Sequence, residues 1–136
     1  QTIIGDDRVV GILVAEGDEL YDRHLTSVRV QLGSNYVVQG AKDDGKCPQF
    51  DSLWTKDLRP DIPMADYSKA EQDIISVAKG FAAEHTMMGA MVLECIGFQP
   101  FARAIQREID MPVFSCSTLL DYAYSVAAHR DFYGHV

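Results

Sequence analysis

The stretch that decides the fold is VVGILV at Val9–Val14, which is followed by EGD at positions 16–18. A short β-branched and aliphatic run is typical of a strand buried in a parallel sheet, and the acidic turn after it predicts the start of a helix. YVVQ at positions 36–39 lies between GSN and Gly40 and predicts a second strand. The first unit is therefore strand, helix, strand. The residues at helical spacing between the two strands are Leu20, His24, Leu25 and Val28.

The second half of the chain repeats this alternation. One apolar stripe predicts a long helix from a cap at Asp66 or Ser68 to about His85. GAMVLE at 89–94 and PVFS at 112–115 predict the third and fourth strands, and Pro100 lies where the first turn of a helix tolerates proline. Thr118 can cap a last helix, after which residues 129–136 are expected to dock as a tail. The apolar positions of the three helices are Ala70, Ile74, Val77, Ala78, Phe81 and Ala82, then Phe101, Ala102, Ile105 and Ile109, then Leu119, Leu120, Ala123, Val126 and Ala127.

Residues 41–65 interrupt this pattern with three prolines and no sustained period. They predict a long loop, and loops of this length inside a domain usually serve a function or are disordered. The apolar side chains of Phe50, Leu53 and Trp54 indicate that part of the loop packs, as a lid or an interface.

Alternation of short apolar strands with amphipathic helices predicts an α/β fold in three layers, with a four-stranded parallel sheet joined by right-handed crossovers. The simplest topology is a flavodoxin-like strand order, 2-1-3-4, within a single domain over residues 1–136. This order places a crevice beyond the carboxyl ends of the first and third strands. The residues expected there are 15–18 and 94–99.

Composition and charge exclude several function classes. Twenty acidic and twelve basic residues give the 136-residue chain a net charge of −8, which repels nucleic acid and anionic lipid. The apolar stretches are shorter than the ~20 residues of a membrane span. Three cysteines without a C-x-x-C pair favour a reducing compartment and hence the cytoplasm, although one disulfide beside one free thiol would fit a secreted protein. The start at Gln1 without methionine predicts a processed or truncated product.

Cys95 is the candidate catalytic residue because it follows the third strand and precedes a helix. Unpaired N–H groups at a helix start favour the ionised thiol, so Cys95 is expected to be the most reactive of the three cysteines and to act as a nucleophile or general base. The alternative is a cysteine that packs as a small hydrophobic residue. Cys116, at the end of the fourth strand, is expected to be such a packed side chain.

The residues around Cys95 resemble a known family. VLECIGFQPFA at 92–102, followed by PVF at 112–114, is similar to the second cysteine motif of the aspartate/glutamate racemase superfamily. VGIL at 10–13 and YVVQG at 36–40 resemble the start of the second lobe in those proteins. The resemblance implies a single racemase-like lobe that acts without a cofactor on a small carboxylate or amino acid. It also implies that Cys95 is one of two proton-transferring thiols and that a partner lobe supplies the other.

The resemblance also suggests how a substrate carboxylate is bound. Family members typically have threonine after this cysteine, where this chain has Ile96, so the backbone N–H groups of Ile96 and Gly97 are the expected carboxylate donors. Glu16 is a candidate polar group on the substrate side, and Ser117 and Thr118 offer hydroxyl or N–H groups to an anion. No metal ion and no cofactor are expected.

Two other functions fit the same residues. The chain could be a noncatalytic interaction module on a racemase-like fold, since a fold does not guarantee an activity. It could also carry out one-thiol chemistry, such as decarboxylation followed by protonation from Cys95. In each case we expect a homo-oligomer or a missing partner lobe, because a lone lobe exposes apolar surface.

Overall fold

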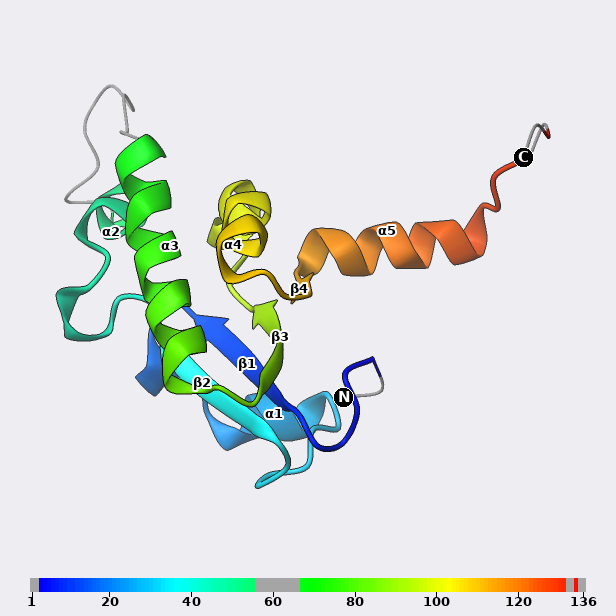
Figure 1. Cartoon of the computed structure of the whole chain (residues 1–136), viewed down its shortest axis with the longest axis horizontal. Coiled ribbons are helices and arrows are strands. Elements are labelled where there is room, and N and C mark those ends of the chain that lie inside the picture. The colour runs from blue at the N-terminus through cyan, green and yellow to red at the C-terminus, as the bar shows by residue number, and fades with distance from the viewer. Residues whose placement is uncertain (1–2, 56–66, 132–133, 135–136) are drawn as a thin grey trace.

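The computed structural model describes residues 3–55, 67–131 and 134. Four strands and several helices alternate along the chain (Figure 1). The strands are β1 (Val9–Val14), β2 (Tyr36–Gly40), β3 (Met88–Leu93) and β4 (Val113–Phe114). The α-helices are α1 (Asp22–Ser27), α2 (Pro48–Trp54), α3 (Tyr67–Glu84), α4 (Ala102–Ile109) and α5 (Cys116–Ala127). Three 3₁₀ helices are η1 (Gly17–Glu19), η2 (Asp43–Gly45) and η3 (Ile96–Phe101).

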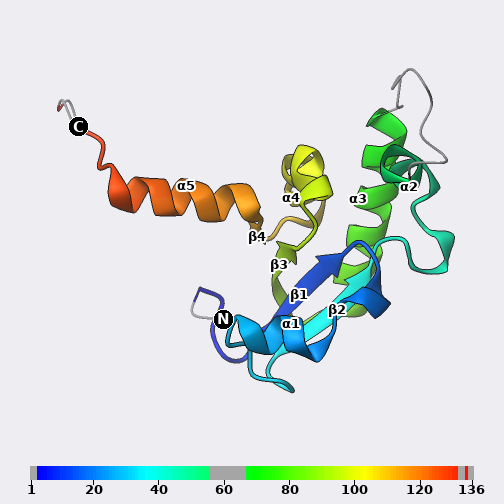
Figure 2. The ribbon, with the colours of Figure 1, turned by 180° about the vertical axis from the view of Figure 1, so that it is seen from behind.

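The sheet confirms the predicted fold class. All its strand pairs are parallel and the strand order is β2-β1-β3-β4, the flavodoxin-like order expected from the sequence. Helices α3 and α4 cover one face of the sheet, and α1 lies against the other face, which is turned to the viewer in Figure 2. None of the helices that the structure describes is long and apolar enough to cross a membrane.

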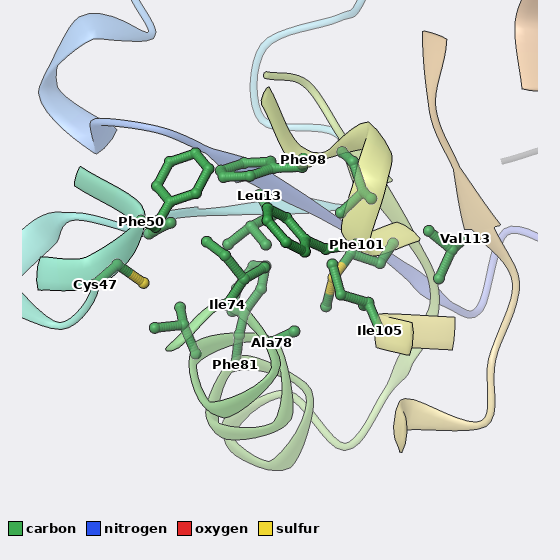
Figure 3. Close-up of a cluster of buried hydrophobic side chains, with 14 of the residues drawn as sticks. Leu13, Cys47, Phe50, Ile74, Ala78, Phe81, Phe98, Phe101, Ile105 and Val113 are labelled. Carbon is green, nitrogen blue, oxygen red and sulfur yellow. The ribbon is translucent and has the colours of Figure 1, made fainter. Parts of the chain in front are cut away.

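The hydrophobic core lies between the sheet and the helices α3 and α4 (Figure 3). The long helix α3 buries the predicted stripe of Ala70, Ile74, Val77, Ala78 and Phe81. These side chains meet Leu13, Met91 and Leu93 from the sheet. Phe50, Phe98 and Phe101 close the core at the carboxyl end of the strands, with the ring centres of Phe50 and Phe98 5.0 Å apart. The core therefore extends to the edge where the sequence predicts a functional site.

The predicted long loop at 41–65 is wrong in its first half, because this segment contains η2 and α2. The helix α2 has Pro48 in its first turn, and a side chain from outside residues 41–65 accepts N–H groups at its start. The carboxylate of Asp73 in α3 accepts the N–H of Gln49 at 2.7 Å and that of Phe50 at 3.4 Å. Phe50 is buried, as expected for a packed segment, and positions 56–65 lie outside the described residues.

The C-terminal region also differs from the prediction. The last helix is capped by Ser115 rather than Thr118, so Cys116 is the first residue of α5 and does not end the fourth strand. No residue of α5 is buried, so neither the predicted apolar stripe nor Cys116 packs. Residues 129–131 and 134 are exposed, contrary to the docked tail that we expected, and the other tail positions lie outside the described residues.

Smaller differences concern the starts of two helices. The first helix spans only Asp22–Ser27 and buries Leu25, while His24 and Val28 are exposed, because η1 takes up the turn after β1. The long helix α3 already includes Ser68, which is therefore not its cap, and Asp66 lies outside the described residues.

Asp43 ties the carboxyl ends of β1 and β2 together. Its two carboxylate oxygens accept the N–H of Gly17 at 3.0 Å and that of Gly40 at 3.2 Å. Glycine at both positions leaves room for this carboxylate, since a Cβ atom on Gly40 would lie 2.1 Å from it and one on Gly17 would lie 2.6 Å from it, and either would displace it. This arrangement fixes the turn that carries Glu16.

We therefore expect Asp43→Asn to lower the free energy of unfolding by about 1–3 kcal/mol, because an amide has one acceptor oxygen and leaves a part-buried N–H facing an NH₂ group. Urea denaturation of the purified chain measures this change. The matched control is Asp44→Asn, which removes the same charge at an exposed neighbouring side chain. Equal losses in the two variants would show that charge, and not the hydrogen bonds of Asp43, sets the stability.

Candidate functional site

Cys95 lies at the carboxyl edge of the sheet, two residues beyond the end of β3. Its extended backbone caps η3, and its carbonyl accepts the N–H of Phe98 at 3.0 Å. The preceding residue, Glu94, donates its N–H to the carbonyl of Leu13 at 3.0 Å, so the turn sits beside the end of β1. The Cys95 side chain is half-buried and packs partly against the core. Cys95 is therefore partly exposed at this edge of the sheet.

The turn after Cys95 carries the expected backbone donors. The N–H groups of Ile96 and Gly97 are the first two of η3 and have no acceptor within that helix. The Ile96 side chain is 71% exposed, whereas Gly97 is buried. A Cβ atom on Gly97 would lie 3.1 Å from the indole of Trp54 and 3.3 Å from the ring of Phe50, so α2 closes over this glycine.

The start of α5 contacts the same turn through Gln99. The N–H of Ser117 donates to Oε1 of Gln99 at 3.2 Å. Among the residues that the structure describes, Nε2 of Gln99 is buried without a hydrogen-bond partner. The structure thus connects two segments that the sequence singled out, the Cys95 turn and the Ser117 region.

Thr118, a candidate anion contact in the sequence, forms hydrogen bonds at the start of α5. Its hydroxyl accepts the N–H of Ser115 and donates to the Ser115 carbonyl, each at 2.9 Å. Its own N–H reaches the Ser115 hydroxyl at 3.5 Å. These bonds form a reciprocal cap that holds the first turn of α5.

Glu16 follows β1, as expected, but its carboxylate is paired with Lys42. The Lys42 ammonium also contacts the Asp51 carboxylate at 2.7 Å. Hydrogen bonds to Asp51 and Glu16 raise the pKa of Lys42, and the bond from Lys42 holds the pKa of Asp51 below its usual range. The ion pair therefore fixes Glu16 and connects the end of β1 to α2.

A small cavity of about 140 Å³ lies between the ends of β1 and β3. Glu16, Glu19, Glu94 and His24 contribute to its lining. A lining with several carboxylates attracts a cationic group. The sequence placed Glu16 and Glu94 at this edge but singled out only Glu16 as a candidate, and the parallel pairing of β1 with β3 brings the two residues to the same cavity.

Gln99 and Trp54 are further residues of this region whose roles the sequence did not indicate. Gln99 lies within the motif of the Cys95 segment, yet its contact with Ser117 follows from the position of β4 beside β3. Trp54 covers Gly97 from α2, the helix that the sequence did not predict.

The other two cysteines have contrasting surroundings. Cys116 is exposed in the first turn of α5. Cys47 is 1% exposed, and burial, with a contribution from the Asp73 carboxylate, raises the pKa of its thiol to about 12. Cys47 is therefore protonated and shielded in the folded chain.

The raised pKa of Cys47 predicts a pH dependence of stability. Unfolding releases the thiol to an ordinary pKa near 9, so above that pH the unfolded chain loses a proton that the folded chain keeps. The stabilising effect of the protonated thiol is complete below about pH 9 and is lost as the pH rises towards 12. We expect the difference in the free energy of unfolding between the wild type and Cys47→Ala, measured by urea denaturation, to decrease as the pH rises over this range. A constant difference would show that Cys47 has the same pKa in both states.

Comparisons with known proteins give a partial similarity. No family model matches the chain, and no solved structure matches it. A segment of 69 residues is 29% identical to dimethylsulfoniopropionate lyase 5 of Emiliania huxleyi (strain CCMP1516). This segment is 51% of the present chain and 14% of that protein, so the chain is similar to a small part of a much longer lyase.

Proposed function

We propose that Cys95 transfers a proton at the carbon next to a substrate carboxylate, in a cofactor-independent active site of which this chain supplies one half. The observation that carries this proposal is the position of Cys95, part-exposed at the carboxyl end of β3 and immediately before the free N–H groups of Ile96 and Gly97. A carboxylate bound by those N–H groups would bring its α-carbon close to the thiol. The resemblance of residues 92–102 to the racemase motif supports the same role.

The acidic cavity beside Glu94 suggests the class of substrate. The N–H groups of η3 would bind a carboxylate, and the acidic residues Glu16, Glu19 and Glu94 favour a cationic group. A small zwitterion satisfies both requirements, with its carboxylate at η3 and its cationic group towards the cavity. Amino acids and sulfonium carboxylates belong to this class.

Two reactions share the first step of this chemistry. In racemisation the Cys95 thiolate takes the α-proton, and a thiol of a partner lobe returns a proton to the opposite face. In elimination the α-proton goes to Cys95, the released electron pair forms the Cα=Cβ bond, and the Cβ–S bond breaks as a neutral sulfide leaves with its electrons. The similarity to a dimethylsulfoniopropionate lyase favours elimination as the second candidate, and this reaction needs one thiol.

The test is proton NMR of the chain in D₂O with aspartate, glutamate or dimethylsulfoniopropionate. Loss of the α-proton signal without a new product is expected for racemase-like transfer, because exchange needs one base even where inversion needs two. Release of dimethyl sulfide and acrylate would identify elimination. Absence of both exchange and elimination with all three compounds would overturn the enzymatic proposal in favour of a noncatalytic module.

A further inference from the structure

The helix α5 exposes an apolar stripe that no other part of the described chain covers. Leu120 is 63% exposed and Val126 is 59% exposed. Asp121 is the only charged residue of α5, although the whole chain carries a net charge of −8. At 100° per residue, Leu119, Leu120, Ala123, Val126 and Ala127 share one side of the helix and Asp121 and Ser125 lie on the other. Such a stripe is typical of a helix that packs against an apolar surface.

The same chain also has an apolar surface that none of the residues described by the structure covers. On the face of the sheet opposite α3 and α4, a groove of about 550 Å³ runs between the strands and α1. Val10, Ile12 and Val92 form its floor, and Leu25 and Val28 line its α1 side. Val28 is 70% exposed at the end of α1. The groove therefore offers aliphatic side chains of the kind that α5 presents.

The start of α5 directs the helix away from the groove of its own domain. Its cap, Ser115, follows the last residue of β4 directly, so no linker allows the helix to turn back. The Ser115–Thr118 cap and the hydrogen bond from Ser117 to Gln99 fix the first turn. In both views α5 extends outward beyond β4 (Figures 1 and 2).

We propose that two copies of this chain exchange their α5 helices, so that the apolar stripe of each α5 lies in the groove of the other copy. The chain carries both halves of the contact, which two copies related by a two-fold axis can satisfy at once in a closed dimer. A helix of twelve residues is about 18 Å long, enough to place its stripe along several strands. Because α5 has one charged residue, docking this helix adds little charge repulsion at the contact itself.

The test combines a helix variant with a groove variant. Leu120→Asp puts a charge on the stripe, and Val28→Asp puts one in the groove, at side chains exposed enough for each variant to fold; circular dichroism checks the fold. Light scattering after size exclusion is expected to show a dimer for the wild type and a monomer for each variant. Ser125→Asp, on the opposite side of α5, is the matched control and is expected to remain dimeric.

Mixing the two variants gives the decisive result. In a mixed pair the intact α5 of Val28→Asp meets the intact groove of Leu120→Asp, so one of the two contacts survives. We expect a heterodimer that is weaker than the wild-type dimer. A monomeric wild type would overturn the exchange. A Val28→Asp variant that remains dimeric while Leu120→Asp is monomeric would also overturn it, because α5 would then bind a surface other than the groove.

Discussion

Replacing Cys95 with serine is expected to lower the rate of α-proton exchange by about 10²–10⁴-fold, the usual contribution of a general base. A serine hydroxyl is nearly the same size as the thiol but is far less acidic, so it cannot act as the anionic base near neutral pH. The measurement is the loss of the α-proton signal of the substrate in D₂O. Circular dichroism of Cys95→Ser establishes that the fold is kept.

The control for this prediction is Cys116→Ser. Cys116 is exposed in the first turn of α5. Its thiol is therefore the one most able to act as a base in place of Cys95. We expect its replacement to leave the exchange rate unchanged. If Cys116→Ser abolishes exchange and Cys95→Ser does not, the base is at the start of α5 and the assignment of Cys95 is wrong.

The sheet could be predicted because its signals are local. VVGILV, YVVQ and GAMVLE are short apolar runs bounded by turns, and their alternation with amphipathic helices restricts the fold to a parallel sheet with few possible strand orders. The place of Cys95 at a strand end follows from the same pattern. Its surroundings do not, because they depend on which strand ends lie side by side.

The elements that the sequence did not predict correctly depend on contacts with distant parts of the chain. The N–H groups at the start of α2 are capped by Asp73, more than twenty positions away, so residues 41–65 contain Pro48 as a helix-start signal but not the capping side chain. Glu16 is held by Lys42 from beyond β2, a pairing that only the strand order creates. For α5 the helical period was informative, but period alone does not say which surface covers an apolar stripe.

The packing of the Cys95 turn gives the largest expected effect on stability. Phe98 is completely buried against Phe50, whereas Ile96, two residues earlier in η3, is 71% exposed. We expect Phe98→Ala to lower the free energy of unfolding by about 3–5 kcal/mol, since it leaves a cavity in the core. Ile96→Ala is expected to change it by no more than about 0.5 kcal/mol. Urea denaturation of both variants measures the difference.

This pair of variants also tests how the core supports the candidate site. The buried ring of Phe98 packs against Phe50 and anchors η3 to the core, so its loss loosens the turn that presents the thiol and the N–H groups of Ile96 and Gly97. Where Phe98→Ala remains folded, we expect it to slow α-proton exchange without removing any group that contacts the substrate. Similar losses of stability in Phe98→Ala and Ile96→Ala would contradict the packing of η3. Unchanged exchange in a folded Phe98→Ala would show that the thiol does not need a rigid turn.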